Sequence, residues 1–154
     1  MKNNVKIFIG SDHAGFDAKE KLKQYFEKKK IMYKDLTPVR YEGDDYPEAA
    51  FAVSTAVAGV HDGRGILVCG SGEGITIAAN KVRGIRAVAA YDAYTAKMSR
   101  LHNDANVLGL SGWHFTQPQL HKIVLIWLKT AFSGEKRHVR RIMEIAAYES
   151  QKHS

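Results

Sequence analysis

The chain of 154 residues contains a single cysteine, Cys69, and this shortage excludes a scaffold held together by disulfide bonds. Only three prolines occur, and 45% of the residues are hydrophobic, which excludes collagen-like, low-complexity and disordered chains. No run of about 18 uninterrupted apolar residues is present, so we expect neither a membrane span nor a signal peptide. These absences predict one globular domain over residues 1–154, located in the reducing environment of the cytoplasm.

Acidic residues are scarce relative to basic ones, because 23 Lys and Arg stand against 16 Asp and Glu, a net charge of +7. This balance suits an anionic partner, although charge alone does not choose among nucleic acid, acidic lipid and phosphate. Residues 19–34 hold seven lysines, which we interpret as a solvated helix face. The chain has no recognition-helix motif, stripe of stacking aromatics or basic low-complexity arm, so we expect neither nucleic acid nor membrane as a partner.

Strand-like and helix-like hydrophobic patterns alternate along the chain. Apolar, β-rich runs predict five strands, at residues 5–9, 31–36, 65–69, 87–90 and 106–110. Amphipathic or capped segments predict six helices, at residues 17–30, 46–60, 75–81, 93–102, 117–130 and 136–151. This alternation with short loops predicts a Rossmann-like, three-layer α/β/α fold with a five-stranded parallel sheet and a C-terminal helix.

Glycines at alternate positions follow the third predicted strand, in the segment Gly70-Ser71-Gly72-Glu73-Gly74. In parallel sheets, ligands bind outside the carboxyl ends of strands, and bare loop amides there hold an anion or a developing oxyanion. The segment matches neither the dinucleotide pattern nor the phosphate loop of nucleotide triphosphatases. Glycines that serve only a tight turn are the alternative explanation.

Cys69 immediately precedes this glycine loop. Amides at the start of a helix favour the thiolate form of a cysteine, and a thiolate can abstract a proton. Beside it, the Ser71 hydroxyl can hydrogen-bond a substrate oxygen. The alternative is that Cys69 is a small buried hydrophobic residue.

Two further polar clusters are candidates for a site. Asp12 and His13 follow the first strand, where they can share proton transfers and anion contacts, although such pairs are also common on surfaces. His102 and Asn103 end the fourth predicted helix, where the alternative role for Asn103 is a helix C-cap.

Arg137 and Arg141 lie four residues apart on the last predicted helix, a spacing that suits two-point capture of a phosphate. A solvated basic face is the alternative. The remaining histidines His61, His121 and His153 have no metal-ligand spacing, so we expect no metal and no cofactor.

Five blocks of the sequence, in order along almost the whole chain, carry a resemblance to one enzyme family. They are residues 10–15 (Gly-Ser-Asp-His-Ala-Gly), 45–47 (Asp-Tyr-Pro), 69–81 (beginning Cys-Gly-Ser-Gly), 84–87 (Gly-Ile-Arg-Ala) and 99–108 (containing His-Asn-Asp-Ala-Asn). The chain resembles the type B ribose-5-phosphate isomerases, a family that also includes the galactose-6-phosphate isomerase subunits.

The resemblance implies a metal-free aldose–ketose isomerisation of D-ribose 5-phosphate and D-ribulose 5-phosphate through a cis-enediolate. It also implies a homodimer, or a tetramer built from such dimers, whose active sites are completed by the neighbouring subunit. Cys69 would move the proton between C2 and C1, and Ser71 would steer proton exchange between O1 and O2. The backbone of residues 70–74 would stabilise the enediolate and contact the substrate through Gly70, Gly72, Glu73 and Gly74.

The resemblance assigns the remaining roles to side chains from several loops. Asp12 and His102 would open the furanose ring, and Tyr46 and Asn103 would hold sugar hydroxyls or the ring oxygen. The phosphate would be held by three basic side chains, His13, Arg137 and Arg141.

Two departures from the family pattern leave the sugar open. Glu73 stands where relatives carry an apolar residue, and its carboxylate could repel a phosphate, contact a hydroxyl of another sugar, or point to solvent, which we favour. Trp113 stands where the family usually has an arginine. The alternatives are therefore an isomerase of another aldose phosphate, such as a hexose 6-phosphate or a tetrose phosphate, and a non-catalytic binder of a sugar phosphate or nucleic acid.

Overall fold

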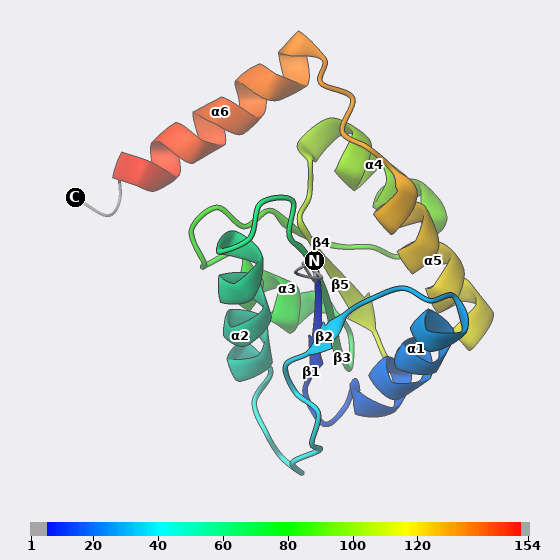
Figure 1. The fold of residues 1–154 in the computed structure, drawn as a ribbon. Helices are drawn as coiled ribbons and strands as arrows, with labels where there is room; N and C mark the ends of the chain where they lie inside the picture. The colour runs from blue at the N-terminus through cyan, green and yellow to red at the C-terminus, as the bar shows by residue number, and fades with distance from the viewer. Residues whose placement is uncertain (1–5, 152–154) are drawn as a thin grey trace, which may run out of the picture.

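The computed structural model describes residues 6–151 of the chain (Figure 1), so Val5 of the first predicted strand and His153 lie outside the described residues. The strands are β1 (Ile7–Ser11), β2 (Lys34–Asp35), β3 (Arg64–Cys69), β4 (Ala87–Ala89) and β5 (Val107–Ser111). The helices are α1 (Phe16–Lys28), α2 (Tyr46–Ala58), α3 (Glu73–Ala79), α4 (Ala93–Asn103), α5 (Gln117–Lys129) and α6 (Lys136–Gln151).

The five strands form one parallel sheet in the order β2-β1-β3-β5-β4. In the register, Ile9 of β1 pairs with Ile66 of β3, which pairs with Leu108 of β5. Strand β2 is added on one side of β1, and β3, β5 and β4 are added on its other side. The carboxyl ends of β1 and β3 flank this change of direction, which is where open α/β sheets bind ligands.

Helices cover both faces of the sheet (Figure 1). Successive residues of a strand point to opposite faces, so Ile9 and Ile66 pack toward α1 and α5, whereas Phe8 and Leu67 pack toward α2 and α3. Helix α6 extends away from this body (Figure 1), and His138 is its one buried residue within the described range. The predicted three-layer α/β/α fold with a C-terminal helix is therefore confirmed.

The element boundaries differ from the predicted ones mainly at two places. The strand predicted over residues 31–36 shortens to Lys34–Asp35, because Lys30 adopts a left-handed conformation (φ 55°) and Ile31 donates its amide back to Phe26 of α1. Helix α3 begins at Glu73, two residues before the predicted start, because Gly72 serves as its N-cap.

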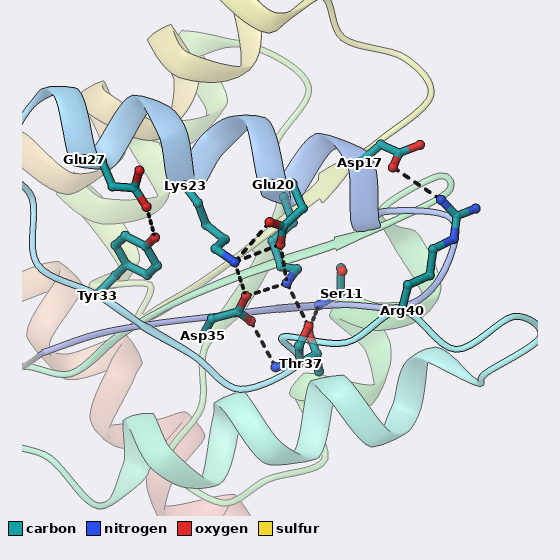
Figure 2. A network of polar contacts seen from close by, with 10 residues as sticks. Ser11, Asp17, Glu20, Lys23, Glu27, Tyr33, Asp35, Thr37 and Arg40 are labelled. Atoms are coloured by element: carbon teal, nitrogen blue, oxygen red, sulfur yellow. Dashed lines mark hydrogen bonds and ion pairs between the residues drawn. The ribbon is translucent and has the colours of Figure 1, made fainter.

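Lys19 is the buried exception to the solvated face predicted for the lysine-rich segment, in which Lys21, Lys28, Lys29, Lys30 and Lys34 are exposed. The Lys19 side chain is 0% exposed, and its ammonium donates to Asp35 Oδ2 at 2.6 Å and to the Thr37 carbonyl at 2.8 Å. Figure 2 shows the rest of this network: Lys23 also contacts Asp35, and Thr37 Oγ1 accepts from the Ser11 amide at 2.9 Å. The network therefore ties α1 and the edge strand β2 to the end of β1.

Among residues 6–151, no helix combines the length and the apolar character that crossing a membrane requires.

Candidate active site

The loops that follow β1, β3 and β5 meet where the parallel strands end. We call this end of the sheet the carboxyl edge, and the end where the strands begin the amino edge. Ser11 pairs with Val68 in the register, and Cys69 pairs with Ser111. Beyond the strands the contact continues, because Ser111 Oγ donates to the Gly70 carbonyl at 2.7 Å. The predicted Asp12-His13 and Cys69–Gly74 segments therefore lie at one edge, together with the loop after β5.

The glycine loop wraps around the sulfur of Cys69. This side chain is buried, and the Gly72 amide donates to its Sγ at 3.1 Å. Gly72 has φ 88°, a left-handed conformation that glycine adopts without steric cost, and its carbonyl accepts from Thr76 Oγ1 at 2.6 Å. An N–H donor aimed at sulfur stabilises negative charge that develops there during a reaction.

Tyr46 lies over the same loop. A Cβ atom added at Gly74 would come within 2.6 Å of Tyr46 Cζ, so the phenol ring packs directly on the glycine. Tyr46 is the first residue of α2, and Pro47 follows in the first turn, where proline is well tolerated. Ser71 is exposed, and its hydroxyl accepts from the Glu73 amide at 3.3 Å.

Asp12 and His13 lie in the loop after β1 with contrasting surroundings. Asp12 is buried and accepts from the Gly15 amide at 2.9 Å, and burial raises the pKa of its carboxyl despite that bond. His13 Nδ1 lies 2.9 Å from Asp44 Oδ1, and the hydrogen bond with Asp44 raises the pKa of the imidazole. His13 is therefore biased toward the cation that an anionic ligand needs.

Asp44 is a residue that reasoning from sequence missed. It lies in the loop before α2, and its carboxylate also accepts from the His13 backbone amide at 2.7 Å. The only signal in the sequence is its place beside Asp45-Tyr46-Pro47, and pairing across 31 residues cannot be read from a single chain.

Glu73 is exposed, as we favoured, but it does not simply face solvent. Its carboxylate accepts from the Tyr91 hydroxyl in the loop after β4. The Tyr91 ring in turn meets His114 edge to face, with 6.3 Å between ring centroids. These two rings line a cavity of about 350 Å³ between the loop after β4 and the start of α5.

The other predicted residues lie at the opposite edge of the sheet. The Asn103 carbonyl accepts from Arg86 Nε at 2.9 Å, and Arg86 immediately precedes β4, so the end of α4 lies at the amino edge. The His102 ring stacks on His138 of α6, with 4.4 Å between ring centroids. The cap role considered for Asn103 is wrong, because Asp104 caps α4 in a left-handed conformation (φ 45°).

Arg137 and Arg141 flank this histidine pair on α6. Both are exposed and one helical turn apart, and Arg137 pairs with Glu135 at 2.9 Å. His138 lies between them, and its pKa is lowered by burial and by the neighbouring His102 and Arg137. One chain therefore presents two groups of predicted site residues, at opposite edges of the sheet, and does not bring them together.

Within residues 6–151, no group of three or more His, Cys, Asp or Glu side chains is placed to hold a metal ion.

Known proteins match this chain over nearly its whole length. The sequence model of the Ribose/Galactose Isomerase family matches residues 7–145. This chain belongs to the ribose/galactose isomerase family. Two relatives within the family are "Ribose-5-phosphate isomerase B" of Escherichia coli K12, 40% identical over 96% of this chain and 98% of the relative, and "Probable ribose-5-phosphate isomerase B" of Mycoplasma pneumoniae, 39% identical over 99% and 100%.

Solved structures of the ribose/galactose isomerase family have the same fold. Ribose-5-phosphate isomerase B of Clostridium thermocellum superposes with a TM-score of 0.90 at 42% identity, covering 97% of this chain and 100% of the other. The enzyme of Mycoplasma genitalium, solved with bound ribulose-5-phosphate, gives a TM-score of 0.89 at 40% identity over 96% and 97%.

Proposed function

We propose that this chain interconverts D-ribose 5-phosphate and D-ribulose 5-phosphate without a metal, through a cis-enediolate, with Cys69 as the base. The observation that carries the proposal is the buried Cys69 thiol that accepts from the Gly72 amide inside a glycine loop. The relatives support the choice of substrate, since they are named ribose-5-phosphate isomerases B and one of them was solved with ribulose-5-phosphate.

The chemistry needs two proton movements. The Cys69 thiolate takes the proton from C2 of the open-chain aldose, and the electrons of that C–H bond form the enediolate with negative charge on O1. The proton on O2 passes to O1 under the guidance of the Ser71 hydroxyl, and Cys69 returns its proton to C1. Amides of the glycine loop stabilise the oxyanion, because donors fixed in advance do not have to reorganise during the reaction.

Ring opening precedes this step for a cyclic sugar. Asp12 supplies a carboxyl whose pKa is raised by burial, so it keeps a proton to higher pH than an exposed aspartate and can exchange it with the ring oxygen. His102 is the second ring-opening group in the proposal. Tyr46 and Asn103 hold hydroxyls or the ring oxygen, and His13, Arg137 and Arg141 hold the phosphate.

We propose a homodimer in which these roles are divided between two copies. His102, Asn103, Arg137 and Arg141 gather at the amino edge, whereas Cys69 lies at the carboxyl edge of the same sheet. A two-fold axis that places the amino-edge group of one copy against the carboxyl-edge group of the other completes two identical sites at once. A tetramer built from such dimers keeps the same sites.

A turnover assay tests the proposed reaction. Wild type and Cys69→Ala are compared on ribose 5-phosphate with and without EDTA, beside hexose 6-phosphates and tetrose phosphates. We expect turnover that resists EDTA in the wild type and is lost in Cys69→Ala with substrate affinity almost intact, since the base acts on the transition state. Full turnover in Cys69→Ala would disprove the role of the thiol, and loss with EDTA would disprove the metal-free mechanism.

Another aldose phosphate is the second candidate substrate. Glu73 places a carboxylate at the rim of the glycine loop, and the Tyr91 hydroxyl donates to it. This carboxylate can accept a hydrogen bond from a hydroxyl of a different sugar. A kcat/KM for another sugar phosphate well above that for ribose 5-phosphate would favour this candidate.

A further inference from the structure

Asp44 contacts His13 at three points. One oxygen of its carboxylate, Oδ1, accepts from the His13 backbone amide at 2.7 Å and lies 2.9 Å from Nδ1 of the ring. The Asp44 carbonyl oxygen lies 3.2 Å from the same Nδ1. Because these contacts hold both the backbone and the ring of His13, the imidazole has a defined orientation in the loop after β1.

Both groups that face Nδ1 of His13 are hydrogen-bond acceptors. A carboxylate and a backbone carbonyl offer no proton, so these hydrogen bonds require that Nδ1 carries one. The other ring nitrogen, Nε2, has no hydrogen-bond partner among residues 6–151, and the side chain is 37% exposed. The chain therefore uses one nitrogen of His13 and leaves the other for a ligand.

Asp44 is itself anchored on both sides. Its amide donates to the Tyr41 carbonyl at 3.3 Å and closes a turn in which Gly43 is left-handed (φ 74°), a conformation that glycine adopts without steric cost. Helix α2 begins two residues later, at Tyr46, whose ring packs on Gly74. The carboxylate that orients the imidazole thus belongs to a segment that also reaches the glycine loop.

Resting on the proposed isomerase function, we infer that Asp44 is a positioning residue, which binds the Nδ1–H of His13 and thereby directs Nε2 to the phosphate of the sugar phosphate. Asp44 itself does not touch the substrate in this role. Because Nδ1 keeps its proton, Nε2 carries a proton only when the imidazole is a cation. The charged form of His13 therefore binds the phosphate, with both a donor and a positive charge.

The charges around His13 predict how this recognition depends on pH. Asp44 and Asp12, a residue of the same loop, both favour the cation, and the hydrogen bond with Asp44 raises the pKa of His13. The turn after β5 packs on the backbone of residues 14–15, but its titratable side chain, His114, meets the loop after β4. Removing the charge of Asp44 should therefore lower the pH at which His13 stops binding phosphate.

Inhibition by inorganic sulfate measures this recognition, because sulfate remains a dianion over the pH range in which histidine titrates. We expect sulfate to inhibit the wild type well at low pH and to weaken as the pH rises through the pKa of His13. In Asp44→Asn, the same weakening should occur about one pH unit lower. The asparagine oxygen can still accept from the His13 backbone amide and from Nδ1, so this variant loses the charge and keeps the geometry.

Arg137 and Arg141, which also hold the phosphate in the proposed homodimer, stay charged over this pH range. They therefore supply sulfate affinity at every pH but do not produce the change with pH.

The kinetics of Asp44→Asn provide a second readout. We expect KM for ribose 5-phosphate to rise about fivefold near pH 8 with kcat within about twofold of the wild type, because the phosphate contact is the same in the ground state and the transition state. In a His13→Gln background, Asp44→Asn should change neither KM nor sulfate inhibition, since the group through which Asp44 acts is absent.

Glu42→Gln is the matched control. It removes a carboxylate from the same loop, but this carboxylate contacts Arg40 Nε at 2.6 Å and not His13. Glu42→Gln should therefore keep the wild-type dependence of sulfate inhibition on pH.

Nitrogen chemical shifts of isotope-labelled histidine report the tautomer directly. The signals of His13 are identified by their absence in His13→Gln. Above its pKa, the wild-type ring should carry its proton on Nδ1, and below its pKa, added sulfate should shift the Nε2 signal more than the Nδ1 signal.

The possible outcomes separate the inference from the proposed function. Suppose that the wild type turns over ribose 5-phosphate. If Asp44→Asn then keeps the wild-type sulfate profile, neutral His13 carries its proton on Nε2, or sulfate leaves the Nε2 signal unshifted, the inference on Asp44 is wrong and the isomerase function stands. If the wild type does not turn over ribose 5-phosphate at all, the proposed function has failed and the inference fails with it.

Discussion

The Gly72 amide donates a hydrogen bond to the Cys69 sulfur at 3.1 Å, and a third residue, Thr76, supports this contact. Thr76, one turn into α3, donates its hydroxyl to the Gly72 carbonyl at 2.6 Å and so anchors the residue whose own amide donates to the thiol. Gly109 of β5 leaves the space for this hydroxyl, because a Cβ atom there would overlap Thr76 Oγ1. The orientation of the Gly72 amide thus depends on Thr76, a residue of α3 outside the glycine loop.

Thr76→Val removes this hydroxyl with little change in size. We expect kcat to fall about tenfold with little change in KM, because a misplaced amide weakens stabilisation of charge in the transition state. The free energy of unfolding should fall by about 1 kcal/mol for the lost hydrogen bond, as measured by urea denaturation.

Thr130→Val is the control for this change. Thr130 donates to the Ile126 carbonyl at 2.7 Å, an equivalent hydrogen bond at the end of α5. Thr130→Val should therefore lower the free energy of unfolding by a similar amount and leave kcat unchanged. An equal loss of kcat in both variants would mean that Thr76 acts only through stability.

Mixing two inactive variants tests whether the active sites are shared. In the proposed homodimer, Cys69→Ala and His102→Ala damage opposite edges of the chain, so a mixed dimer contains one site with both defects and one intact site. Random mixing makes half of the dimers mixed, each with half of its sites intact, so we expect about a quarter of wild-type activity. Activity that stays at zero after exchange of subunits is verified would show that each site is formed by a single chain.

Much of this arrangement can be read from the sequence, because it depends on local patterns. The five strands, six helices and the meeting of the Cys69 and Asp12 loops follow from hydrophobic periodicity and from the rule that parallel strands end at a common edge. The separation of His102 from Cys69 also follows, once α4 is seen to run into the amino end of β5.

Other features depend on contacts between distant segments, which one sequence does not encode locally. Lys19 has the composition of a surface residue and is buried because Asp35, 16 residues away, accepts from it. Asp44 reaches His13 across 31 residues, and the packing of Trp113 on Gly70 requires knowledge of the turn after β5. Tertiary pairing overrides the ordinary preference of these residue types for solvent.

The His13 and Asp44 pair predicts a pH dependence of stability. The hydrogen bond with Asp44 raises the pKa of His13 above its ordinary value of 6.5, so the folded chain holds the imidazole proton more tightly than the unfolded chain. The stability that this contributes is fully present below about pH 6.5 and is lost as the pH rises through the folded pKa. We expect the difference in Tm between wild type and Asp44→Asn to be larger at pH 6 than at pH 9, measured by calorimetry.

His121→Asn serves as a reference that removes a histidine from elsewhere in the fold. Burial lowers the pKa of His121, so its linkage has the opposite sign and the difference in Tm should not shrink toward alkaline pH. A difference for Asp44→Asn that is the same at both pH values would contradict the pairing.

Lys19→Met tests the buried network that ties α1 to the edge strand β2. Asp35 is almost as buried as Lys19, and although burial acts to raise its pKa, the hydrogen bonds from Lys19 and Lys23 lower it overall. Removing Lys19 leaves this carboxylate without its buried partner, so we expect the free energy of unfolding to fall by about 3 kcal/mol. Lys23→Met, at the more exposed contact, should cost about 1 kcal/mol or less.

The pH dependence distinguishes a lost ion pair from lost packing. Because the folded pKa of Asp35 is lowered, its stabilising effect is present above the unfolded value of about 3.8 and disappears as the pH falls through the folded pKa. The free energy of unfolding of the wild type, measured by urea denaturation, should therefore fall on acidification in this range. The free energy of unfolding of Lys19→Met should fall less. Parallel curves for the two proteins would mean that Lys19 stabilises the fold through its aliphatic chain alone.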